Sequence, residues 1–182
     1  VSNRGGQSLW VCGADCTPVL IADPGSGHAA ACHAGWRGVA ARILPEAIAR
    51  LEARGARRDD LIAALGPAIS GPSYQVGEDV VEAVSTSLAT EAMDGSQARL
   101  HLKTIGALGR DTEPDRYRLD IRAAAGLQLQ QAGLAAEHIS HCPLCTFSEP
   151  DLFHSWRRDQ VKAVQWSGIV GQVAEGDSEA SN

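Results

Sequence analysis

The 182-residue chain has few aromatic residues, few lysines and no long hydrophobic segment. Phe, Trp and Tyr together make up 4% of its residues. Lys103 and Lys162 are the only lysines among 16 basic residues, and the formal net charge is -6. Because binding to a nucleic-acid backbone needs clustered positive charge, this balance argues against nucleic acid as a partner. The arginines instead favour planar, bidentate contacts with small anions.

Membrane and secretion signals are also missing. The chain has no run of about 18 apolar residues, the length that a membrane helix requires, and residues 1–4 do not read as a signal peptide. The five cysteines are an odd number, which suits a reducing compartment better than a set of disulfides. We therefore expect a soluble cytoplasmic protein with no membrane partner. Because the sequence opens with Val1, we also expect part of the protein to lie upstream.

The hydrophobic content predicts one domain with a sizeable core. Hydrophobic residues make up 44% of the chain, enough for a single domain over residues 1–174. Residues 175–182 are small, acidic and Ser-rich, which predicts a disordered tail. Alternating strand and helix patterns predict an α/β or α+β fold. Short apolar segments predict strands at 9–11, 19–23, 28–32, 61–65, 74–76, 117–119, 139–142, 163–166 and 169–173.

Apolar spacing of three and four residues predicts three helices. One starts just past Gly38 and runs to Leu51, a second covers residues 78–88, and a third covers 121–132 with Asp120 as its N-cap. Residues 89–115 have weak periodicity and predict only a short helix or flap near 101–105. The helix after Gly38 would direct its free N–H groups toward a small anion, since a helix N-terminus carries partial positive charge.

Cys16 and His33 follow two of the predicted strands. Thiolate and imidazole are common ligands of zinc and copper, and the same pair can form a nucleophile and its base. Asp15, Trp36 and Arg37 lie beside them in the sequence, and such polar groups at a buried strand end are costly without a ligand. Spacing alone leaves open that Cys16 is only a small buried side chain. Two ligands are also fewer than the three of a catalytic zinc site.

Two further polar clusters lie near the C-terminus. Cys142 and Cys145 form a Cys-x-x-Cys, but the chain has no second such motif, so we expect these cysteines to pack or to support a turn. In Arg157-Arg158-Asp159, one arginine could bind an anion while Asp159 orients the other, or all three could form a solvated turn with a local ion pair. The sequence has no P-loop, no G-x-G-x-x-G and no G-x-S-x-G nucleophile elbow.

Five motifs of the chain resemble, in order, the YfiH-like family. This family has been called multicopper polyphenol oxidoreductases or laccase-like proteins, and is more recently interpreted as purine nucleoside phosphorylases. The resemblance covers residues 1–171 and implies a layered α/β sandwich of mixed β-sheets flanked by helices, related to the catalytic domain of cytotoxic necrotizing factor. The motifs are Ala14–Pro18, His33–Gly38, Gly66–Ser70 with Tyr74–Gly77, Leu119-Asp120, and Cys145-Thr146 with Phe153–Asp159.

The resemblance implies a metal-dependent enzyme. Zinc, or alternatively copper, would be held by Cys16, His33 and a histidine of an upstream motif that has no counterpart in this sequence. The implied reaction is phosphorolysis of adenosine, inosine, guanosine and methylthioadenosine, with adenosine deamination as a companion. Purine nucleosides and phosphate would be the partners. We hypothesise that Arg37 contacts phosphate or ribose and that Arg157 or Arg158 assists.

Three alternatives remain open at this point. In a cysteine hydrolase, Cys16 would attack and His33 would act as the base. Copper-dependent phenol oxidation ranks below zinc chemistry, because one cysteine and few histidines do not furnish a full multicopper set. The third alternative is a binding scaffold without catalysis.

Overall fold

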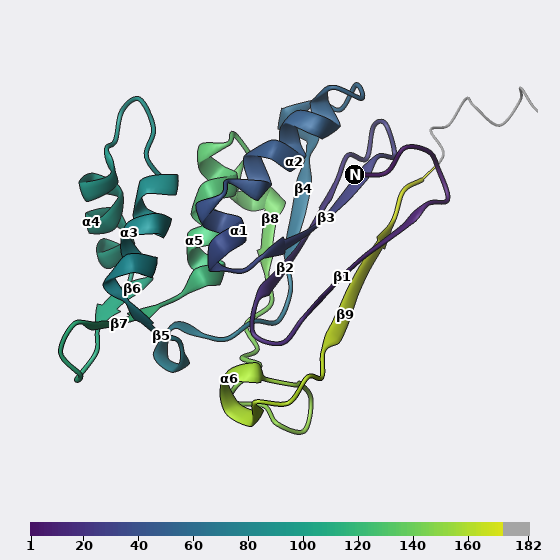
Figure 1. Cartoon of the computed structure of the whole chain (residues 1–182). Helices are drawn as coiled ribbons and strands as arrows, with labels where there is room; N and C mark the ends of the chain where they lie inside the picture. The colour runs from purple at the N-terminus through teal and green to yellow at the C-terminus, as the bar shows by residue number, and fades with distance from the viewer. Residues whose placement is uncertain (173–182) are drawn as a thin grey trace, which may run out of the picture.

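A four-stranded sheet forms the centre of the computed structural model, which describes residues 1–172 (Figure 1). Its strand order is β3-β2-β4-β8. The strand β2 runs antiparallel to both neighbours, whereas β8 runs parallel to β4. The four strands span Thr17–Ala22 (β2), Ala29–Ala34 (β3), Ile62–Leu65 (β4) and Ile139–His141 (β8).

Three helices cover one face of this sheet: α1 (Trp36–Ala40), α2 (Ile43–Glu52) and α5 (Ile121–Gln131) (Figure 1). Alternation along β2 explains this arrangement, because Val19 and Ile21 are fully buried while Leu20, between them, lies on the opposite face. The buried side chains form one apolar core with helix residues. Its fully buried members include Leu44, Ile48, Leu51, Ile121 and Leu129.

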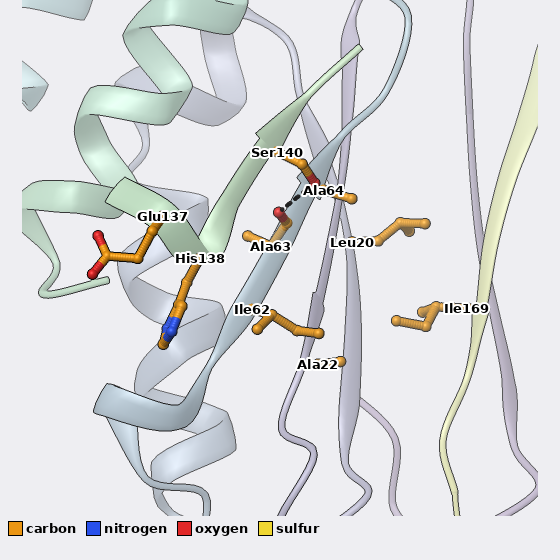
Figure 2. A pocket seen from close by; sticks show the side chains of 9 residues that line it. All are labelled: Leu20, Ala22, Ile62, Ala63, Ala64, Glu137, His138, Ser140 and Ile169. Atoms are coloured by element: carbon orange, nitrogen blue, oxygen red, sulfur yellow. Dashed lines mark hydrogen bonds between the residues drawn. The ribbon is translucent and has the colours of Figure 1, made fainter. Parts of the chain in front are cut away.

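The opposite face of the sheet is only partly covered. The strands β1 (Ser8–Gly13) and β9 (Gln165–Val170) form an antiparallel ribbon that contacts β2 and β3. Over β4 and β8 this face remains open as a groove of about 350 Å³ (Figure 2). Its lining is mostly apolar and includes Leu20, Ala22, Ile62, Ala64 and Ile169.

A smaller sheet of order β5-β7-β6 packs with two further helices. These elements are β5 (Gln75–Gly77), α3 (Glu78–Ser87), α4 (Gly95–Thr104), β6 (Leu108–Arg110) and β7 (Arg116–Leu119). The remaining short helices are η1 (Arg58–Asp60), η2 (Gly71–Ser73), η3 (Ala136–His138) and α6 (Trp156–Asp159). None of the helices described within residues 1–172 is long and apolar enough to cross a membrane.

The prediction that a helix starts just past Gly38 is wrong. Helix α1 begins at Trp36. Arg42, whose φ of 57° is left-handed, then interrupts the helical conformation before α2 begins. Arg37 therefore lies inside a five-residue helix. The longer α2, whose N-terminus was expected to attract an anion, starts further along the chain.

Two other expectations differ from the structure. In place of the two strands expected at 163–166 and 169–173, the described residues form one strand, β9 (Gln165–Val170). Gly168 in this strand gives room to the Trp10 ring, since a Cβ there would lie 2.6 Å from Trp10 Cε3. The weak segment 89–115 contains a full helix, α4, which Asp94 and Gln97 begin with a reciprocal capping box. The expected cap at Asp120 is confirmed, since its carboxylate accepts from the N–H of Ala123. The tail expected at 175–182 lies outside the described residues.

Candidate functional site

Cys16 and His33 meet where β2 begins and β3 ends. Cys16 lies in the bend between β1 and β2, and His33 pairs with Pro18 across the β2–β3 ladder. The Nδ1–H of His33 donates to the carbonyl oxygen of Cys12 at 2.9 Å. This bond orients the imidazole ring and leaves Nε2 to meet another partner.

Gly35 leaves space between the thiol and the imidazole. A Cβ at this position would lie 2.6 Å from Cys16 Sγ and 3.4 Å from His33 Nε2, so both atoms border the same point. A sulfur and an imidazole nitrogen are donors that suit zinc or copper. Within residues 1–172, however, no three His, Cys, Asp or Glu side chains gather to hold a metal. Among the described residues, Cys16 and His33 could therefore supply two of the ligands of a metal site.

Asp15 ties distant parts of the chain to this bend. Its carboxylate is buried and accepts from Thr146 Oγ1 and from the Arg157 backbone N–H, both at 2.7 Å. Its carbonyl oxygen accepts from the N–H of Ile69 at 2.9 Å. The backbone of Asp15 has a φ of 91°, a conformation uncommon for a residue with a side chain.

Tyr74 and two arginines complete the surroundings of the thiol. The Arg157 guanidinium lies 5.0 Å from the Tyr74 ring centroid and donates through Nη1 to the carbonyl oxygen of Gln75 at 2.8 Å. Arg37 is exposed, with its guanidinium 4.3 Å from the Trp36 ring centroid. The site therefore offers positive charge and a π-face near Cys16.

Burial shapes the protonation of this site. It raises the pKa of Tyr74 to about 12, with smaller contributions from the charges of Cys16, Arg157, Arg37 and Asp15. The phenol is therefore neutral at physiological pH and keeps its O–H donor. Burial also raises the pKa of the Cys16 thiol, as does the Asp15 carboxylate, while Arg37 acts in the opposite direction.

Residues 1–172 match the protein family described as multi-copper polyphenol oxidoreductase laccase. The chain belongs to this family. Among its relatives are proteins named purine nucleoside phosphorylase from Synechocystis sp., 46% identical over 178 residues, and from Bacillus subtilis, 34% identical over 171 residues. Each alignment covers 93% of this chain, but 66% and 56% of the respective relative.

Solved structures of the family have the same fold. YlmD from Geobacillus stearothermophilus is 31% identical with a TM-score of 0.80, and the match covers 93% of this chain and 59% of that one. YfiH from Bacillus licheniformis is 29% identical with the same TM-score, and the shares covered are 92% and 59%. The chain thus spans between half and two thirds of the length of these relatives. Its mixed α/β architecture is that of the solved structures of this family.

The two adjacent arginines that the sequence could not separate have different surroundings in this family member. Arg158 uses all five N–H groups within the protein: Nε and Nη2 contact the carboxylate of Asp159 at 2.7 and 2.8 Å. Its other three N–H groups donate to the carbonyl oxygens of Thr146, Phe147 and Phe153. Arg158 therefore fastens the loop before α6, and the local ion pair with Asp159 is confirmed.

Sequence reasoning did not identify Tyr74 or Thr146 as parts of the site. Both stand inside motifs that carry the family resemblance, which was the available signal. The expectation for the Cys-x-x-Cys is confirmed at Cys145, whose Sγ accepts from the Ser70 N–H at 3.3 Å and so supports the turn before η2. All five cysteines are free thiols.

The open groove over β4 and β8 lies away from this chemistry. Its polar lining consists of Glu137, His138 and Ser140, and neither Cys16 nor His33 borders it (Figure 2). We therefore place the candidate active site of this family member at the Cys16–His33 end of β2 and not in the groove.

Proposed function

We propose that this chain carries the catalytic part of a metal-dependent purine nucleoside phosphorylase. The observation that carries the proposal is the pairing of Cys16 Sγ and His33 Nε2 around one point beside Tyr74 and two arginines. The relatives named purine nucleoside phosphorylase support the reaction class. The proposed substrates are adenosine, inosine, guanosine and methylthioadenosine, with phosphate as the second substrate and adenosine deamination as a companion reaction. We retain the cytoplasm as the proposed location.

Zinc is the metal that we propose, with copper as the alternative. A bound zinc would supply a Lewis acid and a means of lowering the pKa of water. Cys16 and His33 would hold it, and the Cys12 carbonyl keeps the imidazole in the required orientation. Catalytic zinc sites usually have three protein ligands, so the third donor would have to come from outside residues 1–172.

The arginines would bind phosphate and orient it for attack. In phosphorolysis a phosphate oxygen forms a bond to the ribose C1′, the bond from C1′ to the purine nitrogen breaks, and the base leaves with the bonding electrons and takes up a proton. Arg37 and the exposed part of Arg157 can neutralise the phosphate charge. The neutral Tyr74 O–H can donate to a substrate oxygen. Such pre-positioning lowers the barrier by converting an encounter of two substrates into a reaction within one complex.

The alternatives from other reaction classes have less support. A cysteine hydrolase would use Cys16 as its nucleophile, whereas the relatives described above are named purine nucleoside phosphorylase. Multicopper phenol oxidation needs several histidine-rich sites, whereas the whole chain has 6 histidines and two donors meet at this site.

Metal analysis combined with turnover assays tests the proposal. We expect the full-length protein to contain zinc and to consume inosine and adenosine, with hypoxanthine and adenine release that depends on phosphate. Cys16→Ser and His33→Gln should lose both zinc and turnover, while Cys142→Ser, a free thiol outside the pair, should retain both. Turnover of both nucleosides by metal-free protein would overturn the proposal. Phosphate-independent release blocked by alkylation of Cys16 would instead support the hydrolase.

A further inference from the structure

We propose that Asp15 is a positioning residue that holds Arg157 in place for phosphate. The inference rests on the proposed function, because it names how one side chain prepares the phosphate contact of that site. Asp15 lies next to Cys16, yet its carboxylate points to two segments more than a hundred residues away along the chain. Each of its oxygens accepts one hydrogen bond at 2.7 Å, from Thr146 Oγ1 and from the Arg157 backbone N–H.

The bond to Arg157 completes the start of α6. This helix has four residues and begins after Ser155, whose Oγ accepts from the N–H of Arg158 at 3.2 Å. The N–H of Arg157, one residue earlier, is satisfied by Asp15. So short a helix does not form on its own propensity. Its geometry, and with it the direction of the Arg157 side chain, depends on these two caps.

The guanidinium of Arg157 is held at its other end by the segment that starts β5. Nη1 donates to the carbonyl oxygen of Gln75, and the guanidinium lies over the Tyr74 ring. Arg157 thus spans from the Cys16 bend to Tyr74, and Asp15 fixes its backbone end. Loss of that anchor would keep the positive charge of Arg157 but change its direction, and this would weaken its contact with phosphate.

The backbone of Asp15 supports a specific role for this carboxylate. Its φ of 91° is costly for a residue with a side chain, and such conformations persist where surrounding contacts hold them. Asparagine tolerates positive φ well. Asp15→Asn therefore keeps the shape and the backbone and can still accept from Thr146. The other side-chain atom of asparagine is an NH₂ donor, which cannot accept the hydrogen bond from the Arg157 N–H.

Asp23 provides a matched control at the other end of β2. It is also buried, and its carboxylate accepts two backbone bonds, from Gly25 at 3.2 Å and from Ser26 at 3.1 Å. Asp23→Asn removes a similar pair of charge-assisted bonds without touching the candidate site. A loss common to both variants reports general stability, whereas a loss confined to Asp15→Asn reports positioning.

Phosphate kinetics of the full-length protein separate the two roles. We expect Asp15→Asn to raise KM for phosphate about tenfold with kcat changed by less than about twofold, and Asp23→Asn to change neither. In the Arg157→Ala background, Asp15→Asn should add nothing to KM, because residues acting through one another are not additive. Equal KM values for Asp15→Asn and wild type, or a full additional effect in the Arg157→Ala background, would overturn the inference.

A second readout works without turnover. Phosphate should protect Arg157 against modification by phenylglyoxal, measured by mass spectrometry of the peptide, and Asp15→Asn should weaken this protection about tenfold in phosphate concentration. If the wild type shows no phosphate-dependent turnover, the proposed function fails, and this protection decides the role of Asp15. Should Asp15→Asn not fold, Thr146→Val removes the hydroxyl that orients the carboxylate and should raise the phosphate concentration for protection about threefold. Unchanged protection in that variant contradicts the positioning role.

Discussion

Substitution of Gly35 by alanine tests whether Cys16 and His33 share a metal. The backbone of Gly35 has φ -69° and ψ 173°, which alanine adopts without strain. The added Cβ would, however, lie 2.6 Å from Cys16 Sγ, 3.2 Å from Cys16 Cβ and 3.4 Å from His33 Nε2. The methyl group therefore acts on the space between the two donors and on little else.

The distances set the expected size of the effect. To reach an ordinary contact of about 3.5–4.0 Å, the Cys16 sulfur must move by roughly 1 Å. Zinc sites tolerate deviations of about 0.2 Å from ideal distances, so the sulfur and the imidazole could no longer bind one ion. We expect zinc affinity to fall at least about 100-fold, since even loss of outer-shell partners costs 10–100-fold. Overpacking should cost about 1–3 kcal/mol of unfolding free energy.

Zinc affinity by competition with a chromogenic chelator, and urea unfolding of the metal-free protein, provide the measurements. Gly109→Ala is the control, because a Cβ there meets one atom, at 4.0 Å. Cys16→Ser keeps the space open but removes the thiolate and should lose zinc without the overpacking cost. If Gly35→Ala bound zinc as tightly as the wild type, the shared metal point would be refuted.

Three further predictions follow from individual contacts. Arg158→Ala should lower the free energy of unfolding in urea titrations and leave KM for phosphate unchanged in the folded fraction, because the five N–H groups of Arg158 bind the protein. Burial opposes ionisation of Cys145, but bonds from Ser148 and Ser70 lower its pKa to about 6, below about 8.5 for a free thiol. Its thiolate therefore stabilises the fold most above about pH 8.5, and this contribution is lost as the pH falls toward 6; Cys145→Ser should abolish that part of the pH dependence of unfolding. On β2 and β4, Ile21→Ala should cost about 2–5 kcal/mol but Ile62→Ala less than about 1 kcal/mol in the same titration, because Ile62 is 45% exposed.

Local sequence signals predicted the elements that depend on local interactions. The spacing of Val80, Val81 and Val84 identified α3, and Asp120 marked the start of α5 because its side chain bonds three residues ahead. Other elements had weaker local signals. The helix α4 has a weak apolar stripe, so only the capping box between Asp94 and Gln97 marks its start. Helices α1 and α2 are separated at Arg42, which adopts a left-handed backbone conformation although it is not glycine. The residue type therefore did not reveal the break.

The candidate site shows the same division. Cys16 and His33 were candidates from sequence because each lies beside a predicted strand and within a motif of the family resemblance, and their residue types limited the chemistry. The partners of Asp15 could not be predicted from the sequence, since Thr146 and Arg157 reach it only in the folded chain. The residue types of Arg157 and Arg158 do not indicate which guanidinium binds the loop and which lies over Tyr74. That distinction arises from the loop before α6, whose carbonyl oxygens surround one arginine and leave the other on Tyr74.

Adjacent arginines with opposite surroundings reveal how the site is organised. Arg158 gathers backbone carbonyls and a carboxylate, as a structural cation does when a loop has too few donors of its own. Arg157 contacts one carbonyl and an aromatic face, and its side chain remains exposed. Because consecutive residues in the single turn of α6 point in different directions, Arg158 faces the preceding loop while Arg157 reaches Tyr74 and the Gln75 carbonyl. The folded loop thereby places one guanidinium over Tyr74, while the other binds the carbonyl oxygens of that loop.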